Sequence, residues 1–386
     1  MVKPEFKPFN FTVDSASKFR VISKNKEIID FTGSAMSVGY NFFEPESIKP
    51  AVSKLVFNNI YTEKLTEKLL NFSGFENVAY TTSGTEACDT ALSRFGKPIY
   101  ALEGSYHGLT YLTRLVSNGT GYDAENKIIH LKVPSRNFSV SRAIEYNDKL
   151  ISDSNIPKGG TLIFELIQSD GGVNILPKNF INYVIGIAEN KGLKIIVDEV
   201  YTGYGRSGEM LLFKKYGITP DMVCLGKGMA AGLPLGAVLY NGKWELPYND
   251  VLNMQAANMF VSSIANRVID AITEHILENV RKNGECILSK FQSIKGGSIY
   301  SSRGNGYMIG IEITNKKGEP DGNTALEIRD EIFGQGVALS LTGEFNNVLK
   351  ITPPVLIDDS TLNEAVNIIA NVLSSKGIGG ENVVKK

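Results

Sequence analysis

Two charged residues follow apolar runs of the sequence and are suited to chemistry. Asp198 comes directly after Leu193–Val197, and Lys227 lies between two glycines directly after Met222–Leu225. Desolvation lowers the pKa of a buried lysine toward about 7–8, which suits a Schiff-base or proton-transferring amine. A carboxylate at the mouth of a buried strand is costly unless a cation or several donors meet it. Asp198 therefore either caps the next turn or holds a heteroaromatic nitrogen in its protonated form.

Two further polar segments also follow apolar runs. Ser83, Gly84 and Thr85 form a small turn that opens a predicted helix, and Tyr106 lies in a loop further along the chain. Free N–H groups and the helix dipole make such a turn an anion site suited to phosphate, with plain N-capping as the alternative. The Tyr106 ring is placed either to stack on a planar ligand or to pack as an ordinary loop aromatic.

Together these residues describe a single ligand. A phosphate site at Gly84 and Thr85, a carboxylate for a ring nitrogen at Asp198, an imine-forming amine at Lys227 and a stacking ring at Tyr106 are what pyridoxal phosphate requires. The joint pattern therefore favours a pyridoxal phosphate site over the separate structural alternatives.

A glycine-rich segment offers a competing interpretation. Residues 203–208 read G-x-G-x-x-G, the pattern of a dinucleotide-binding turn. The segment lies some 200 residues into the chain, is separated from the preceding strand and is followed by too short a helical stretch before Pro220. We therefore expect a loop here and not a nicotinamide site.

The elements that position these residues alternate between strands and helices. Seven apolar runs predict a doubly wound, mostly parallel seven-stranded sheet, since strands covered on both faces are apolar throughout. These runs are Asn77–Thr81, Pro98–Leu102, Lys127–Val133, Gly160–Ile167, Leu193–Val197, Met222–Leu225 and Leu235–Tyr240. Helices are expected at Glu46–Val56 and Thr62–Phe72 and, later, at Ile276–Phe291, Ala325–Phe333 and Leu362–Ser374.

The organisation of the chain predicts a large ligand-binding domain and a smaller α+β domain. We assign residues 46–275 to the large domain and 276–386 to the small one, in which strands are expected at Ser298–Ser302, Tyr307–Ile313, Gly336–Leu341 and Val348–Thr352. Residues 1–45 contain a predicted hairpin of Phe19–Ile22 and Glu27–Thr32 that joins the small domain. The Gly-rich tail after residue 376 is expected to be mobile.

Composition limits the class of protein. The chain has 386 residues, 42% hydrophobic residues and a formal net charge of −1, so neither nucleic acid nor an anionic membrane is the expected partner. No apolar run approaches the roughly 20 residues that span a bilayer, and the N-terminus resembles neither a secretion signal nor a transit peptide. Three cysteines without a CxxC pair and three scattered histidines predict no disulfide framework and no metal site. These features favour a cytoplasmic enzyme.

From about residue 32 to residue 373 the sequence resembles the class III aminotransferases, which are fold type I pyridoxal phosphate enzymes. The similarity is sharpest in TTSGTEACDTAL (81–92), EGSYHGLTYLT (103–113), ELIQSDGGV (165–173), IIVDEVYTGYGRSG (195–208) and PDMVCLGKGMAAGLPLGA (220–237). Weaker similarity extends over residues 301–313 and 349–357.

The resemblance implies a role for each matching residue. Lys227 matches the lysine that forms the internal aldimine and moves the proton between Cα and C4′. Asp198 matches the carboxylate on the pyridine nitrogen, Val200 the residue under the ring and Tyr106 the aromatic on its opposite face. Ser83, Gly84 and Thr85 match the phosphate-binding turn. The family is dimeric, with each active site completed by the partner subunit.

Several positions depart from the family pattern. Tyr201 replaces a glutamine near the cofactor's phenolic oxygen, and Leu166 replaces the proline of a Glu-Pro pair. The partner's phosphate-binding threonine is not recognisable, and the positions that could replace it are Asn253, Gln255 and Asn258.

The small domain carries a further departure. Lys350 occupies a position where family members commonly have an arginine that binds a substrate carboxylate. A lysine ammonium is a point charge and cannot form the two parallel hydrogen bonds that an arginine guanidinium forms with a carboxylate. Asp170 matches an acidic residue that can pair with that arginine, so we hypothesise a switchable Asp170–Lys350 pair.

The resemblance implies a homodimeric aminotransferase that transfers an amino group from an amino acid or ω-amine to a 2-oxo acid by ping-pong chemistry. An aminomutase of the glutamate-1-semialdehyde type or a racemase of the same fold is the alternative within the fold. A non-catalytic relative that serves in binding or assembly is the alternative from another class, and the presence of Lys227 and Asp198 argues against it.

Overall fold

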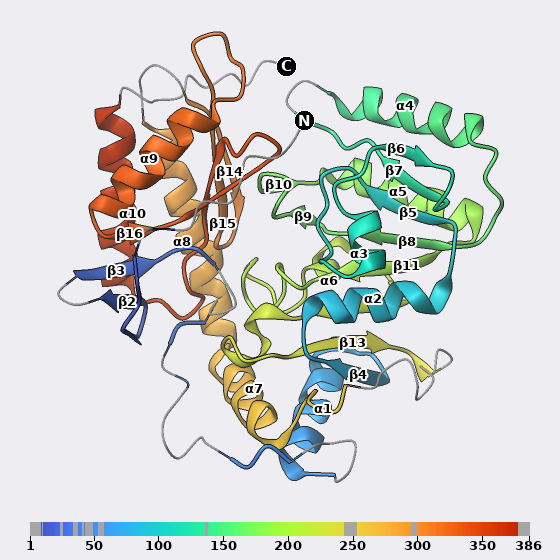
Figure 1. Ribbon diagram of the computed structural model, residues 1–386, viewed down its shortest axis with the longest axis horizontal. Coiled ribbons are helices and arrows are strands. Elements are labelled where there is room, and N and C mark those ends of the chain that lie inside the picture. The colour runs from blue at the N-terminus through green and yellow to red at the C-terminus, as the bar shows by residue number, and fades with distance from the viewer. Residues whose placement is uncertain are drawn as a thin grey trace.

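The computed structural model shows two layered regions joined by long helices (Figure 1). It describes residues 9, 11–23, 26–33, 38–40, 42, 49–52, 58–135, 138–242, 253–294 and 299–376. Among these residues no helix is both long and apolar enough to cross a membrane.

The larger region is built on an eight-stranded sheet with the order β4-β13-β12-β11-β8-β5-β7-β6. Its strands are β4 (Asn77–Thr81), β5 (Ile99–Leu102), β6 (Gly121–Asp123), β7 (Ile128–Leu131), β8 (Thr161–Phe164), β11 (Lys194–Asp198), β12 (Met222–Leu225) and β13 (Gly236–Tyr240). The strands pair in parallel from β12 to β7, while β13 and β6 run antiparallel to their neighbours. All seven predicted strands are present, but the run Gly160–Ile167 is divided. Its strand β8 ends at Phe164, and Ile167 begins β9 (Ile167–Gln168), which pairs with β10 (Asn174–Ile175) in a separate two-stranded sheet. β6 was not predicted, because its three residues carry no apolar run.

Helices cover both faces of this sheet (Figure 1). They are α1 (Ile60–Ser73), α2 (Gly84–Phe95), α3 (Tyr111–Val116), α4 (Val140–Asp153), α5 (Lys178–Lys191), α6 (Leu212–Tyr216) and α7 (Met259–Ala271). Alternate strand residues enter two separate apolar clusters: Ile163 and Ile196 lie on the side of α2, whereas Phe164 and Val197 lie on the other side. Because both faces are covered, the strands are apolar throughout, as the sequence predicted.

A second antiparallel sheet, of order β14-β15-β18-β17, forms the smaller region. Its elements are α8 (Glu274–Gln292), β14 (Ile299–Asn305), β15 (Met308–Ile313), α9 (Gly322–Gly334), β16 (Val337–Ala338), β17 (Ser340–Thr342), β18 (Val348–Ile351) and α10 (Asp359–Ser375). The single strand predicted at Gly336–Leu341 is two strands, and β16 and β17 belong to different sheets.

The N-terminal strands pack against the smaller region. The predicted hairpin consists of β2 (Arg20–Ser23) and β3 (Lys26–Asp30), and β1 (Ser15–Ser17) adds a third strand. On its other edge β3 pairs in parallel with β16, where Ile29 lies opposite Val337. This pairing supports our proposal that residues 1–45 join the small domain; the domain boundaries near residues 45 and 275 remain proposals.

The glycine-rich segment 203–208 forms a series of turns and not the start of a helix. Within it Arg206 is buried, and its guanidinium donates hydrogen bonds to the backbone carbonyls of Tyr307 (3.3 Å) and Pro353. The backbone N–H of Tyr307 donates in return to the carbonyl of Arg206 (2.9 Å). The segment therefore connects the large sheet to the small one, and the predicted loop at residues 203–208 is confirmed.

Two predictions fall on residues that the structure does not describe. Most of the predicted helix Glu46–Val56 lies outside the described residues, and residues 49–52, which are described, form no helix. The predicted mobile tail after residue 376 also lies outside them.

Candidate active site

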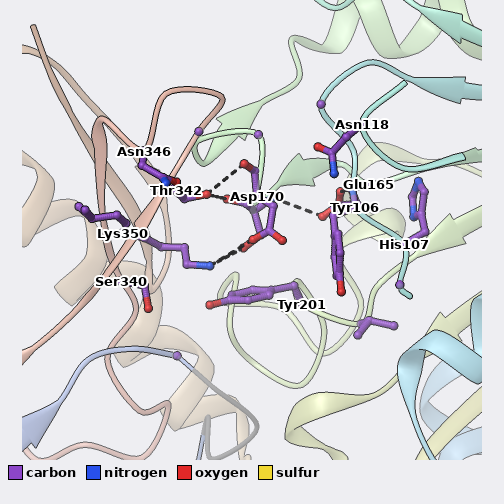
Figure 2. A pocket seen from close by; sticks show the side chains of 18 of the residues that line it. Tyr106, His107, Asn118, Glu165, Asp170, Tyr201, Ser340, Thr342, Asn346 and Lys350 are labelled. Atoms are coloured by element: carbon purple, nitrogen blue, oxygen red, sulfur yellow. Dashed lines mark hydrogen bonds and ion pairs between the residues drawn. The ribbon is translucent and has the colours of Figure 1, made fainter. Parts of the chain in front are cut away.

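A cavity of about 1790 Å³ opens at the carboxyl ends of the parallel strands, where ligands of open α/β sheets bind. Every residue that the sequence analysis assigned to the site lines it: Ser83, Gly84, Thr85, Tyr106, Asp170, Asp198, Val200, Lys227 and Lys350. Residues of β17, β18 and the loop between them close the cavity from the small sheet (Figure 2).

The turn after β4 begins α2 and is stabilised by hydrogen bonds between its own residues. The Ser83 hydroxyl accepts a hydrogen bond from the backbone N–H of Glu86 (3.2 Å), while the Glu86 carboxylate accepts from the N–H of Thr82 (2.8 Å). A Cβ on Gly84 would lie 2.5 Å from Val200 Cγ1, so only glycine allows this close contact. The backbone N–H groups in the first turn of α2 therefore face the cavity, and the close contact between Gly84 and Val200 fixes their position.

Two of the three candidate amides have partners within the chain. The Asn253 amide donates to the Glu86 carboxylate and to the Thr82 hydroxyl (3.3 Å each). The Asn258 side chain accepts from the N–H of Val261 and caps α7. Asn253 therefore supports the turn of its own subunit, and Asn258 is committed to a helix cap.

Asp198 ends β11 and is almost completely buried. Its Oδ1 accepts from the N–H of Val200 (2.9 Å), and its Oδ2 accepts from His107 Nδ1 (2.7 Å) and from the Cys88 thiol (3.3 Å). A cation or several donors were expected to meet a carboxylate in this position, and the three contacts described here come from within the chain. No role was predicted for His107 or Cys88.

The environment of Asp198 determines two protonation states. Burial alone would lower the pKa of His107, but the hydrogen bonds to Asp198 and Cys88 and the charge of Asp198 raise it to about 9. Contact with Cys224, burial and the charge of Asp198 raise the pKa of the Cys88 thiol well above its usual range. Asp198 therefore faces an imidazolium and a neutral thiol. One ligand-type atom from each of Cys88, His107 and Asp198 lies within 4.8 Å of the others, and these direct hydrogen bonds account for that grouping.

Lys227 follows β12 in a tight turn with a positive φ of 43°, which is uncommon for a residue with a side chain. A Cβ on the preceding Gly226 would lie 2.9 Å from Gly84 Cα, so the lysine turn and the helix turn are in direct contact. The Lys227 Nζ lies 4.7 Å from the centre of the Tyr201 ring. The strand end thus directs the amine into the cavity beside Tyr201.

Lys350, on β18, and Asp170, in the loop after β9 (Ile167–Gln168), approach each other across the cavity (Figure 2). The Lys350 Nζ lies 3.5 Å from Asp170 Oδ1, 3.3 Å from Ser169 Oγ and 4.9 Å from the centre of the Tyr201 ring. Burial lowers the pKa of Lys350, but Tyr201 and Asp170 outweigh it and raise the pKa above its usual value. The buried ammonium therefore stays charged, with only a long contact to a carboxylate that is 38% exposed.

Tyr201 lies between the two lysines. Burial raises the pKa of its hydroxyl, but the charges of Lys350, Arg206 and Lys227 outweigh burial and lower it. Tyr201 departs from the family pattern, and its ring lies next to the amines of both Lys227 and Lys350.

Comparison with known proteins identifies relatives of this chain. The family model for class-III aminotransferases matches residues 21–373. An alanine/serine racemase from Pyrococcus horikoshii is 29% identical over 89% of this chain and 81% of its own length. An acetylornithine aminotransferase from Aquifex aeolicus is 26% identical over 91% and 93% of the two chains.

Solved structures confirm the fold. A phospholyase from Arthrobacter superimposes with a TM-score of 0.85 over 96% of both chains at 22% identity. The predicted architecture of the fold type I enzymes is therefore correct, and the match of the family model over most of the length shows that this chain belongs to the class-III aminotransferases.

Proposed function

We propose that the cavity binds pyridoxal 5′-phosphate and that the protein catalyses transamination. The observation that carries the proposal is the convergence of an anion-binding turn, a buried carboxylate and a lysine on one cavity. The glycine contacts at Gly84 and Gly226 leave no room for a Cβ and bring these three elements together. The described residues therefore fit a phosphorylated pyridine aldehyde.

Each residue then has a physical task. Ser83, Gly84 and Thr85 would hold the phosphate at the start of α2, while Val200 and Tyr106 would confine the ring from its two faces. Asp198 would keep a proton on the ring nitrogen, because a buried carboxylate favours a nearby positive charge.

The bound cofactor would supply an electron sink that weakens the Cα–H bond of an amino substrate. Lys227 is the base that would take this proton and return it at another carbon, since its amine reaches the cavity beside Tyr201. Nitrogen would pass from an amino acid or ω-amine to the enzyme and then to a 2-oxo acid. A transfer assay with a ¹⁵N-labelled donor tests the proposal: we expect ¹⁵N in the amino product of the acceptor. Absence of label with every donor and acceptor tried would contradict it.

Racemisation is a second candidate, favoured by the relative that is named an alanine/serine racemase. A racemase has to remove and return a proton on opposite sides of Cα. Lys227 follows β12 and Asp170 follows β9 (Ile167–Gln168), so the two groups enter the cavity from different elements. Incubation of one enantiomer in D₂O without an acceptor distinguishes the reactions, because only a racemase forms the deuterated opposite enantiomer in excess over enzyme. Formation of a positional isomer in the same assay would indicate an aminomutase.

We further propose that Lys350 binds a substrate carboxylate in place of Asp170. Replacing Lys350 by Ala is expected to raise the KM for a dicarboxylate acceptor by about 10–100-fold, since a hydrogen bond to a charged group contributes about 1.5–3 kcal/mol. Lys132→Ala is the matched control, because Lys132 lines the same cavity but pairs with Glu103 at 2.7 Å. An unchanged KM in Lys350→Ala, or an equal rise in both variants, would refute this role.

We also propose a homodimer with the active sites at its interface. Leu109 and Tyr111, which follow the Tyr106 loop, expose 70% and 77% of their surface, and Met254, next to Asn253, exposes 53%. Large exposed apolar side chains beside a cavity are typical of a surface covered by another subunit. Sedimentation at micromolar concentration tests this proposal, and a monomer would contradict it.

A further inference from the structure

Glu165 is a cavity residue to which the functions discussed above assign no task. It comes directly after β8, lines the cavity and is only 5% exposed. In the described part of the chain it forms no salt bridge. A buried carboxyl group without a cation is retained only where hydrogen bonds compensate its desolvation.

Both carboxyl oxygens of Glu165 accept hydrogen bonds from the backbone. Oε1 accepts from the N–H of Tyr106 (2.9 Å), and Oε2 accepts from the N–H of Ser169 (3.3 Å). These two donors belong to different loops, one after β5 and the other after β9 (Ile167–Gln168). One side chain therefore links the residue proposed to cover the cofactor ring to the segment that contains Asp170.

The two loops are also in direct contact. The Gln168 amide donates to the Glu103 carbonyl (2.8 Å) and to the Ser105 hydroxyl (3.0 Å). A Cβ on Gly171 would lie 2.9 Å from the Gly104 carbonyl oxygen, so the backbones touch. Loops packed this closely transmit a displacement of one to the other.

The second loop is also hydrogen-bonded to the small sheet. The Thr342 hydroxyl donates to the carbonyls of Ser169 (2.9 Å) and Asp170 (3.1 Å), and the N–H of Gly343 also donates to Asp170 (3.1 Å). With the Lys350 contacts described above, an unbroken series of bonded groups runs from Tyr106 through Glu165 to Lys350 (Figure 2).

We propose that Glu165 is a positioning residue that sets Tyr106 relative to the Asp170–Lys350 pair, so that cofactor stacking and carboxylate binding depend on one side chain. The catalytic part of this inference rests on the proposed function, while the linkage between the loops does not. Burial, followed by the charges of Asp198 and Asp170, raises the pKa of Glu165 well above its usual range. A raised pKa favours the protonated form, which adds no third negative charge beside those two aspartates.

Glu165→Gln tests the linkage, because the amide keeps the shape but replaces one acceptor oxygen by a donor NH₂ that faces a backbone N–H. Glu103→Gln is the matched control: Glu103 is another cavity carboxylate, but its side chain pairs with Lys132 and bonds to neither loop amide. In the full-length protein without added cofactor, we expect hydrogen exchange at the Tyr106 or Ser169 amide to be about tenfold faster in Glu165→Gln than in wild type or Glu103→Gln. Unchanged exchange at both amides would overturn the proposal.

The effect on function is tested with the same two variants after they are loaded with pyridoxal phosphate. Glu165→Gln is expected to weaken cofactor binding and to raise the KM for a carboxylate substrate, each by about five- to tenfold, while Glu103→Gln changes neither. A fall in kcat alone, with cofactor affinity and KM unchanged, would place Glu165 at the reacting atoms and overturn the positioning role. If wild type itself fails to bind pyridoxal phosphate, the proposed function fails, but the exchange measurement still decides the linkage.

Discussion

Replacing Lys227 by Ala is expected to lower the rate of amino transfer by about 10⁴-fold, the largest effect of any single substitution considered. In the proposed function the amine would both attach the cofactor and move the proton at Cα, and groups that act as nucleophile and general base each contribute several orders of magnitude. The measurement is single-turnover transfer from a labelled donor. Borohydride treatment of the wild-type enzyme is expected to label the peptide that contains Lys227, and the variant should remain unlabelled.

Two controls accompany this substitution. Lys194→Ala removes a lysine at the opposite end of the neighbouring strand, where it pairs with Asp221, and should leave turnover unchanged. A small primary amine added to Lys227→Ala should restore part of the rate, because it replaces the missing base. Turnover near the wild-type rate in Lys227→Ala, without added amine, would rule out the proposed mechanism.

Replacing Asp198 by Asn should have the second-largest effect, a loss of about 10³-fold in kcat. A contact between unit charges contributes about 6 kcal/mol gross at an effective dielectric constant near 20, and about 4 kcal/mol of this has to survive desolvation to give that factor. Asp221→Asn is the control, because it removes a carboxylate from the segment between β11 and β12 far from the cavity end of the strand. A loss in Asp198→Asn of less than tenfold would contradict the assigned role.

The stability lost in Asp198→Asn should also depend on pH. The pKa of His107 is about 9 in the folded protein, against about 6.5 for an exposed histidine, so the ion pair stabilises the fold fully below about pH 6.5. That contribution is lost as the pH rises through about 9. Without added cofactor, the difference in melting temperature between wild type and Asp198→Asn should therefore be largest near pH 6 and smallest above about pH 9. A difference that does not change with pH would show that His107 is not the partner.

The sequence predicted those parts of the fold that local patterns encode. Strands such as Met222–Leu225 are covered on both faces and are therefore apolar at every residue, which fixes their position in the chain. The division of residues 337–342 between two sheets was not predictable, since it depends on the partners β3 and β18, which lie far away in sequence. The edge strand β6 pairs on one side only, so its three residues need no apolar pattern.

The site could be predicted where chemistry requires a residue type and not where packing selects one. Lys227 and Asp198 are unusual at strand ends, and this drew attention to them. The contacts of Asp198 with Cys88 and His107 span 110 and 91 residues of sequence, and no spacing rule predicts them. Cys88 lies four residues after Gly84, one helical turn further along the face of α2 that meets the sheet, and this was the only available signal. The role of Glu165 required the two loops to be seen in contact.

The pairing of β3 with β16 has a consequence for how this protein is made. The two strands lie about 300 residues apart, so at about 5–20 residues per second a ribosome needs about 15–60 s to deliver the second after the first. During that time the edge of β3 that pairs with β16 in the finished fold lacks this partner, and its backbone groups are open to pairing with another nascent chain. Expression yield should therefore respond more to chaperone supply and translation speed than the stability of the finished protein would suggest.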